Sequence, residues 1–378
     1  MNLFDVYSLL DMEPVKAQGA YLWDKAGQEY LDFYGGHAVI SIGHTHPHYV
    51  EKISEQLSKI GFYSNAVVNS LQVELAEKLG ALSSYDDYSL FLCNSGAEAN
   101  ENALKLASFT TGRERVLAMR SAFHGRTSLA VTVTDNPNIQ APVNKTDKVS
   151  FIPFNDAEAL RKELSSGKYA AVIVEPIQGV GGIQVATDEF MLAAREACDA
   201  TGTMLICDEI QAGYGRSGKF FSHQWSGVKA DIITLAKGIG IGFAKGAVMI
   251  SPSIPAKKGM LGTTFGGSHL ACAAAIAVAD VVKDENLVEN ARVMGEKIMT
   301  GIAGVSGVKD IRGRGLIIGI DLSVPQADFR KVLREKYHIM TGLTGQYTLR
   351  LLPPLMIGQT EVDRFVEAFR ATAQEMGM

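Results

Sequence analysis

An acid and an amine stand at the ends of two short apolar runs in the middle of the chain. Met204–Cys207 and Ile232–Leu235 are too short for helices and are predicted to be buried strands that lead towards Asp208 and Lys237. A carboxylate and an amine at neighbouring strand ends can hold the two ends of a conjugated cofactor, the lysine as an imine and the carboxylate beneath a ring nitrogen. This pair indicates pyridoxal phosphate. Taken alone, such a pair is more often an acidic loop and a surface lysine.

A second candidate site follows the apolar run SLFLCNS, which leads directly into the helix-favouring segment SGAEANENALKLAS. The first backbone amides of a helix have no partner inside the helix and can bind an anion. We therefore expect Ser95, Gly96 and Ala97 to form a phosphate site. The alternative is an ordinary turn between strand and helix, capped by Ser95.

Two further predicted strands also end near polar or aromatic residues. Val116–Met119 is followed by Phe123 and Arg126, which could stack on a ring and bind a carboxylate. The segment AAVIVEPI is another apolar run that is predicted to be a strand, and it ends near the polar residues Glu175 and Gln178. Each of these residues taken singly is more typical of a core or a surface position.

The elements that must position these residues alternate between strand and helix from about residue 71 to residue 250. This alternation predicts an α/β fold with a mostly parallel sheet and helices on both faces. Ligands of such sheets bind beyond the carboxyl ends of the strands. Five residues from separate segments are expected there, and their convergence favours the functional interpretation: Ser95, Phe123, Gln178, Asp208 and Lys237.

The two ends of the chain are expected to form a smaller domain. Residues 21–33 alternate apolar and polar side chains around a turn at Lys25–Gly27, which predicts a β-hairpin. After about Asp280, amphipathic helices alternate with short strands such as LIIGIDL and YTLRLLPPL. We expect residues 1–50 and 271–378 to share the small domain and residues 51–270 to form the large one.

Composition narrows the class of function. The 378 residues are 47% hydrophobic and 20% charged, with a formal net charge of −5 and no long basic run. These values predict a compact protein that acts on small molecules and has neither a nucleic acid nor a membrane as partner. The four cysteines are isolated and are expected to be reduced core residues. The N-terminal segment has no signal-peptide pattern, and no run is long enough to span a membrane, so we expect a cytoplasmic protein.

Three closely spaced histidines, His44, His46 and His48, suggest a metal site at first sight. Alternate residues of a strand share one face, but Pro47 and Gly43 predict a turn here, and we expect no carboxylate or cysteine close by. We therefore expect a loop that enters a helix near Pro47, and no bound metal.

A second motif, GYGRSG, matches the glycine pattern of dinucleotide-binding folds at Gly213, Gly215 and Gly218. That pattern requires an amphipathic helix directly after the third glycine and an acidic residue at the end of the next strand. The chain continues KFFSHQWSG, and Asp231 begins a predicted strand. A nicotinamide cofactor is therefore not expected.

Taken together, these segments resemble the class III aminotransferases of fold type I, close to the acetylornithine, succinylornithine and ornithine group. The resemblance runs almost from end to end and rests on GAYLWDKAGQEYLDF, NSGAEANENALKLA, AFHGRT, VEPIQGVGGI, DEIQAGYGRSG, LAKGIG, TTFGGSHLACAAA and RLLPP. It implies a large domain with a mostly parallel sheet flanked by helices, and a smaller α+β domain built from both chain ends. It also implies a homodimer with active sites at the subunit interface.

The resemblance assigns roles around the cofactor ring. Lys237 would be bonded to pyridoxal phosphate, Asp208 would pair with the pyridine nitrogen, and Gln211 would approach the ring hydroxyl. Phe123 would cover one face of the ring. Once a substrate amine displaces it, Lys237 would serve as the base that moves the proton in transamination.

Further roles concern the phosphate and the substrates. Gly96 and Ala97 would donate amides to the phosphate, and Thr264 would reach it from the partner subunit. Arg126 would bind the α-carboxylate of an ornithine-type substrate, and Thr263 would contact that substrate from across the interface.

Two positions depart from the family pattern. The family usually has threonine where this chain has Ala97, and glutamate where it has Val180. That glutamate pairs with the arginine matching Arg350, the expected carboxylate site for glutamate or 2-oxoglutarate. An unpaired arginine facing a pocket is costly unless water or a substrate anion meets it. We hypothesise that Arg350 helps to hold an acyl group with an extra carboxylate, as in N-succinylornithine. The alternative is that another acid supplies the charge.

The expected reaction is transfer of the terminal amine of an N-acylornithine to 2-oxoglutarate, in arginine biosynthesis. Ornithine, 4-aminobutyrate or lysine ω-aminotransferases and an aminomutase are the alternatives among enzymes. An inactive binding relative is the alternative outside them. Retention of Lys237, Asp208, Gln211, Arg126 and Arg350 argues against an inactive protein.

Overall fold

A seven-stranded sheet forms the centre of the large domain in the computed structural model, which describes residues 1–378. From one edge to the other its strands are β4 (Ser89–Cys93), β12 (Gly246–Ile250), β11 (Ile232–Leu235), β10 (Met204–Asp208), β7 (Tyr169–Val174), β5 (Arg115–Met119) and β6 (Val149–Ile152). β12 is antiparallel to both of its neighbours, β4 and β11, and all the other neighbouring pairs are parallel. The prediction of a mostly parallel sheet is confirmed.

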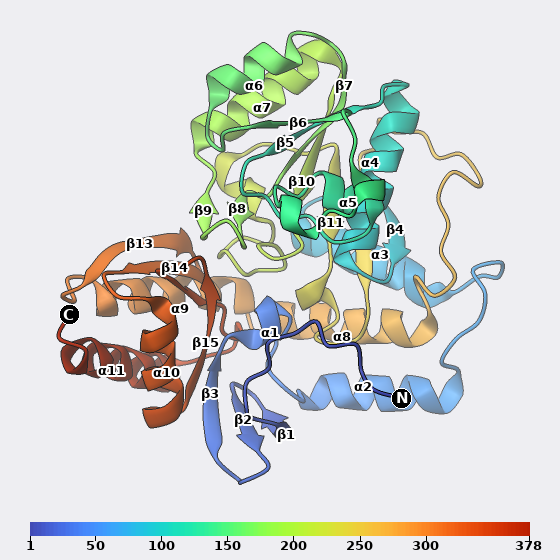
Figure 1. Cartoon of the computed structure of the whole chain (residues 1–378). Coiled ribbons are helices and arrows are strands. Elements are labelled where there is room, and N and C mark those ends of the chain that lie inside the picture. The colour runs from blue at the N-terminus through green and yellow to red at the C-terminus, as the bar shows by residue number, and fades with distance from the viewer.

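Helices cover both faces of this sheet (Figure 1). They are α3 (Ser70–Ser83), α4 (Gly96–Thr111), α5 (Ser128–Thr132), α6 (Ala157–Leu164), α7 (Asp188–Thr201) and α8 (His269–Asp284). Alternate residues of β7 face opposite sides: Ala171 and Ile173 pack with α4, whereas Val172 and Val174 join the larger core with α7 and α8. No helix combines the length and the apolar character needed to cross a lipid bilayer.

Short elements complete the large domain. They are α2 (Pro47–Lys59), the two-stranded sheet of β8 (Ile177–Gln178) and β9 (Gln184–Val185), and the 3-10 turns η1 (Pro137–Ile139), η2 (Pro142–Asn144), η3 (Ser222–Ser226) and η4 (Lys237–Ile239). The helix expected near Pro47 therefore begins at that residue.

A second seven-stranded sheet joins the two ends of the chain. Its order is β1 (Pro14–Gln18), β2 (Tyr21–Asp24), β3 (Glu29–Phe33), β15 (Ile339–Thr344), β16 (Thr348–Leu351), β14 (Ile317–Leu322) and β13 (Val308–Arg314). The predicted hairpin is β2 and β3, and β3 pairs in parallel with β15. Figure 1 shows the blue N-terminal strands beside the red C-terminal ones.

Four helices belong to the small domain: α1 (Gly35–Ala38), α9 (Leu287–Ile302), α10 (Gln326–Lys336) and α11 (Gln359–Glu375). The smaller α+β domain built from both chain ends is therefore as expected. The particular boundaries near residues 50 and 270 stay a prediction.

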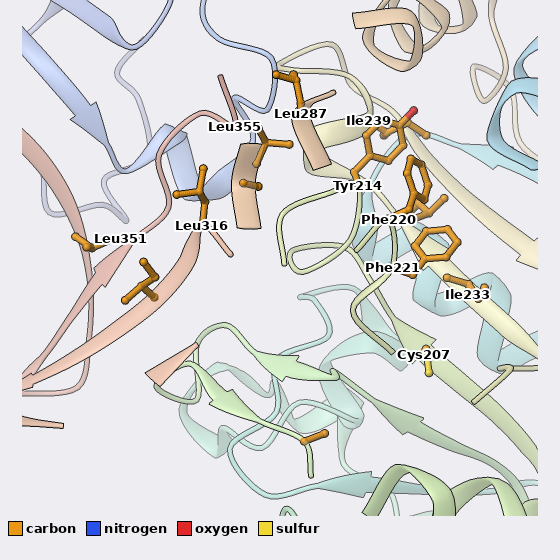
Figure 2. Close-up of a cluster of buried hydrophobic side chains, with 14 of the residues drawn as sticks. Cys207, Tyr214, Phe220, Phe221, Ile233, Ile239, Leu287, Leu316, Leu351 and Leu355 are labelled. Atoms are coloured by element: carbon orange, nitrogen blue, oxygen red, sulfur yellow. The ribbon is translucent and has the colours of Figure 1, made fainter. Parts of the chain in front are cut away.

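One continuous cluster of 61 buried hydrophobic residues joins the two domains. Figure 2 shows its middle, where the labelled side chains run from the large sheet through an aromatic loop to the small domain: Cys207, Ile233, Tyr214, Phe220, Phe221, Ile239, Leu287, Leu316, Leu351 and Leu355. Shared burial on this scale holds the domains together by the hydrophobic effect.

The aromatic loop is also the segment with the dinucleotide-like glycine pattern. It enters the short turn η3 after Gly218 and forms no α-helix there, so the helix that such a motif requires is missing. The buried Arg216 of this loop donates hydrogen bonds to the carbonyls of Leu316, at 3.0 Å, and Pro353. Burial lowers the pKa of Arg216 to about 9. The loop therefore ties the large domain to the small one.

Candidate active site

A cavity of about 580 Å³ is lined by residues that follow β4, β5, β7, β10 and β11, and so lies at the carboxyl ends of the parallel strands. Eight of the predicted site residues line it together: Ser95, Gly96, Ala97, Phe123, Arg126, Asp208, Gln211 and Lys237. Most of the residues that were predicted to meet at the strand ends therefore line one cavity. Such a cavity suits a cofactor together with a small substrate.

Lys237 begins η4, two residues after β11, and its backbone has a φ of 49°. This left-handed conformation is costly for a residue with a side chain and is held here by the surrounding structure. Burial lowers the pKa of the Lys237 amine, while the negative charges of Asp208 and Glu175 act in the opposite direction. A lowered pKa increases the neutral fraction of the amine, which is the form that attacks a carbonyl carbon or accepts a proton.

Asp208 ends β10 and is held by three donors. Its Oδ2 accepts from Asn100 Nδ2 at 2.8 Å and lies 2.7 Å from His124 Nδ1, and its Oδ1 accepts from the amide of Ile210 at 3.0 Å. Thr234 in turn donates to Asn100 Oδ1 at 2.8 Å. Only 4% of the surface of Asp208 is exposed, so these contacts satisfy a buried carboxyl group and fix its orientation.

His124 and Asn100 were not predicted as site residues. Signals for both were present in the sequence. His124 directly follows Phe123 at a strand end, and Asn100 is a polar residue among the alanines and leucines of the buried face of α4. Neither signal indicates that the two side chains meet at Asp208.

Glu175 follows β7 and also lines the cavity. Its two carboxyl oxygens accept from the amide of Phe123, at 2.8 Å, and from the amide of Gly179, at 3.1 Å. Burial raises the pKa of Glu175 to about 7, partly opposed by His124. Glu175 therefore fixes the backbone that carries Phe123 and the backbone that leads into Val180.

The expected phosphate site lies at the first turn of α4. Ser95 caps the helix, because its Oγ accepts from the amide of Glu98 at 3.1 Å. A Cβ added to Gly96 would lie 2.9 Å from the side chain of Ile210, so a larger residue here would force Ile210 to move. The amides of Gly96 and Ala97 belong to the first turn, where no intrahelical acceptor exists.

Arg350 lies on β16, and only 4% of its surface is exposed. Its Nη1 donates to the carbonyl of Gly179 at 2.8 Å, and no carboxylate forms a salt bridge with it. Burial lowers its pKa, with a smaller opposing effect from Tyr34 and Glu175. Val180, where the family usually has glutamate, is 46% exposed and lines the cavity. Arg350 itself lies behind Gly179 and outside the cavity lining.

Three other predicted residues lie outside this cavity. Thr264 is exposed, and the Oγ1 of Thr263 accepts from Asn94 Nδ2 at 3.2 Å. Gln178 was expected at the ligand-binding edge, but its amide nitrogen donates to the carbonyl of Arg120 at 2.8 Å. Because β8 turns back towards β9, Gln178 supports the backbone of a neighbouring segment and does not line the cavity.

The three histidines near Pro47 have carboxylate neighbours that the sequence did not indicate. His44 lies 2.8 Å from Asp32, His46 lies 2.9 Å from Glu285 and His48 lies 3.2 Å from Asp280. The expectation that no carboxylate is close was wrong, because these acids come from distant segments. Each histidine has a different carboxylate, and no group of three possible metal ligands is present.

Several polar atoms at or beside the cavity are buried without a hydrogen-bond partner: Nε2 of His124, Oε1 of Gln211 and Nε of Arg350. Buried polar atoms are nearly always satisfied in folded proteins, so the unpartnered atoms of His124 and Gln211, two residues of the cavity lining, favour a polar ligand here. Pyridoxal phosphate fits the residues present. Lys237 offers an amine, Asp208 a fixed carboxylate, Phe123 a ring, and α4 its first amides.

Comparison with known sequences agrees with this fit. The model of the class III aminotransferase family matches residues 6–372. The acetylornithine aminotransferase of Methanosarcina mazei is 39% identical over 356 residues, which cover 93% of this chain and 89% of that protein. The acetylornithine aminotransferase of Bacillus subtilis is 37% identical over 375 residues, covering 98% and 97%.

Solved structures show the same fold. The ornithine aminotransferase of Toxoplasma gondii superposes with a TM-score of 0.91 at 29% identity, covering 98% of this chain and 92% of that one. The acetylornithine aminotransferase of Elizabethkingia anophelis gives a TM-score of 0.85 at 31% identity, covering 98% and 95%. These comparisons support pyridoxal phosphate as the cofactor, and this chain belongs to the class III aminotransferase family.

Proposed function

We propose that this aminotransferase moves the terminal (δ) amine of an N-acylornithine, such as N-acetylornithine, to 2-oxoglutarate, giving the semialdehyde and glutamate. The main support for this class of substrate is the position of two arginines. Arg126 is exposed in the cavity wall, Arg350 is buried beyond it, and neither has a carboxylate partner in the chain. Two separated cations suit substrates whose carboxylates lie at different distances from the reacting amine. The names of the relatives from M. mazei and B. subtilis support the acyl-ornithine choice.

Different residues of the cavity have different roles in the proposed reaction. Pyridoxal phosphate, when bound, supplies the electron sink for the carbanion. Lys237 Nζ would be the base that takes up the proton leaving the carbon that bears the substrate amine. Its pKa, lowered by burial, favours the neutral amine that can accept this proton. Asp208 would face the ring nitrogen, and His124 and Asn100 orient its carboxyl group.

The surroundings of Arg350 bear on which acyl group the ornithine substrate carries. Val180 leaves Arg350 without the neighbouring glutamate that the family usually provides. The only acid that bears on the pKa of Arg350 is Glu175, and burial raises the pKa of Glu175 to about 7, so it is a weak substitute. This arrangement supports an extra carboxylate on the donor, as in N-succinylornithine.

A homodimer completes the proposed site. Helix α2 has no buried residue, and exposed apolar side chains follow it at Phe62 and Tyr63. The ring of Phe62 lies 5.5 Å from that of the exposed Phe265, which adjoins Thr264. A second copy seated on this surface would bury it and could carry Thr264 to the partner's phosphate site.

A cytoplasmic location is consistent with four free, buried cysteines.

Subunit complementation tests the shared site. The variants Lys237→Ala and Thr264→Ala are mixed under conditions that exchange subunits. In a mixed dimer, the Thr264→Ala subunit keeps its own Lys237 and receives Thr264 from its partner, so cofactor affinity at that site is restored. If mixing never restores it, the site lies within one chain.

The reaction is tested by single-turnover absorbance with four amino donors: N-acetylornithine, N-succinylornithine, ornithine and 4-aminobutyrate. Rapid loss of the yellow cofactor band is expected with an acylornithine only. Rapid reaction with free ornithine would instead identify an ornithine aminotransferase, the activity named for the structurally similar T. gondii protein.

A further inference from the structure

A left-handed turn of the backbone lies beside the active-site cavity. Four consecutive residues of α1 have positive φ angles: Gly35 at 55°, Gly36 at 54°, His37 at 65° and Ala38 at 67°. This conformation suits glycine but is costly for histidine and alanine, which carry a Cβ. Strain of this kind persists only where the surrounding structure imposes it, and it is common at functional sites. The fold therefore holds His37 in a conformation that its own backbone disfavours.

Contacts on two sides hold the turn against the cavity. Oδ1 of the buried Asp32 accepts from the amide of Tyr34 at 3.0 Å and from the amide of Gly35 at 2.8 Å. The carbonyl of His37 accepts from Nε2 of Gln211 at 3.2 Å, and Gln211 lines the cavity. His37 is therefore fixed next to the cavity through its own backbone.

Tyr34 and Arg350 approach each other over one glycine of the small-domain sheet. Phe33 pairs with Thr341 in the parallel ladder of β3 and β15. The residues that follow them are Tyr34 and Gly342, and Gly342 in turn pairs with Arg350 of β16. A Cβ added to Gly342 would lie 3.0 Å from the ring of Tyr34 and 3.3 Å from Cβ of Arg350. The missing side chain of Gly342 thus leaves the space in which the phenol and the arginine meet.

The imidazole of His37 joins this row through Tyr34. Its Nε2 lies 2.5 Å from Oη of Tyr34, and the two rings meet edge to face with their centroids 4.7 Å apart. Burial raises the pKa of Tyr34, whereas partial burial and the charges of Arg350 and Lys237 lower the pKa of His37. Near neutral pH the phenol therefore donates to Nε2 of a neutral imidazole, which leaves the ring proton on Nδ1. That N–H group forms no hydrogen bond within the chain.

The cations around Tyr34 have no acid to balance them. Nε of Arg350 is buried without a partner, and Nη1 donates only to a carbonyl. Arg330 donates to the carbonyl of Thr341, and its positive charge bears on the pKa of both Tyr34 and Arg350. Two unpaired guanidinium groups and the free N–H group of His37 thus adjoin the same phenol ring. Such a set of donors favours a carboxylate ligand.

We propose that His37 is a specificity-determining residue, which donates a hydrogen bond from Nδ1 to the substrate carboxylate that Arg350 binds, with its ring oriented by Tyr34. The proposal rests on the proposed function, because that carboxylate belongs to a substrate of the same reaction. Two sources share this chemistry. One is the acyl group of N-succinylornithine, and the other is glutamate or 2-oxoglutarate.

The test uses substitutions that suit a left-handed backbone. His37→Gly removes the imidazole and tolerates a φ of 65°, whereas His37→Asn keeps an N–H donor in a residue that adopts this conformation readily. Single-turnover reactions of the holoenzyme are followed with N-succinylornithine, glutamate and N-acetylornithine. His37→Gly should lower kcat/KM about 10- to 100-fold, the usual effect of a hydrogen bond to a charged group, for at least one of the first two donors. N-acetylornithine, whose only carboxylate is assigned to Arg126, should be unaffected.

The pattern of losses identifies the source of the carboxylate. A loss for N-succinylornithine alone assigns it to the acyl group, a loss for glutamate alone assigns it to the second substrate, and a loss for both assigns one site to both. No loss, or a loss that N-acetylornithine shares equally, would overturn the proposal.

Further variants separate binding from structure. His37→Asn should recover part of the loss, and Tyr34→Phe should show part of it for the same donor. Combined with Arg350→Gln, His37→Gly should cost less than the product of the two single losses, because both residues act on one carboxylate, and independent losses would contradict this. Cofactor affinity should stay unchanged in the His37 variants, since Gln211 binds a backbone carbonyl that they keep.

The wild-type enzyme tests the proposed function separately. Faster reaction with free ornithine than with either acylornithine would refute the acylornithine donor whatever the His37 variants do. Selective reaction with an acylornithine, together with equal losses for all donors in His37→Gly, would refute only the role of His37.

Discussion

The Oδ2 of Asp208 lies 2.7 Å from Nδ1 of His124, although the two residues are 84 positions apart in the sequence. Both side chains are buried, and Asn100 contacts the same oxygen. The carboxylate expected to meet the cofactor ring is therefore held in one orientation by groups that do not themselves react. This arrangement makes His124 and Asn100 positioning residues for Asp208.

Replacing His124 with alanine should lower kcat about 10- to 100-fold, as loss of an orienting partner commonly does, with a smaller effect on the KM of the donor. His124→Asn, which still offers a hydrogen-bond donor, should retain more activity than the alanine variant. The pH dependence of the cofactor absorbance gives a second readout, because a misplaced Asp208 holds the ring proton less well. Unchanged kcat and unchanged absorbance in His124→Ala would contradict the role.

Glu175 should make the stability of the cofactor-free chain depend on pH. Its folded-state pKa, raised to about 7, exceeds the ordinary carboxyl value of 4.5. Between these values the folded chain binds a proton that the unfolded chain has lost, so the free energy of unfolding falls as pH rises from about 4.5 to 7. Urea unfolding of Glu175→Gln across this range should lack that part of the decline. Parallel curves for wild type and variant would contradict the shifted pKa.

Adding one methyl group at Gly96 should damage the phosphate site. The new Cβ would lie 2.9 Å from the side chain of Ile210. Overpacking of this kind typically destabilises by about 1–3 kcal/mol. Gly96→Ala should therefore lower the melting temperature and weaken cofactor binding. The double variant with Ile210→Ala makes room and should recover part of both losses, whereas strictly additive losses would show that the contact is not the cause.

Val180→Glu should restore a carboxylate near Arg350. If Arg350 holds an extra carboxylate of the donor, the new ion pair competes with it, and kcat/KM for N-succinylornithine should fall about tenfold relative to N-acetylornithine. Val180→Gln is the neutral control of the same size. Equal changes in kcat/KM for both donors in Val180→Glu would contradict the hypothesis that Arg350 holds an extra carboxylate of the donor.

The sequence predicted the parts of the site that depend on local pattern. Short apolar runs locate Asp208 and Lys237 at strand ends, and parallel strands bring such ends together. The meeting of His124 and Asn100 at Asp208 depends on how α4 packs on the sheet, which no local pattern records. The raised pKa of Glu175 arises from burial created by several segments. Gln178 was misplaced because the turn between β8 and β9 directs its side chain towards Arg120.

The identity of the lysine that carries the cofactor tests the central claim most directly. Borohydride reduction of the yellow enzyme fixes the cofactor to its lysine, and mass spectrometry of the digested protein locates the modified residue. Lys237 is predicted to carry the pyridoxyl group, with Lys245 unmodified. A pyridoxyl group on Lys245 or any other lysine, with Lys237 free, would contradict the proposed active site.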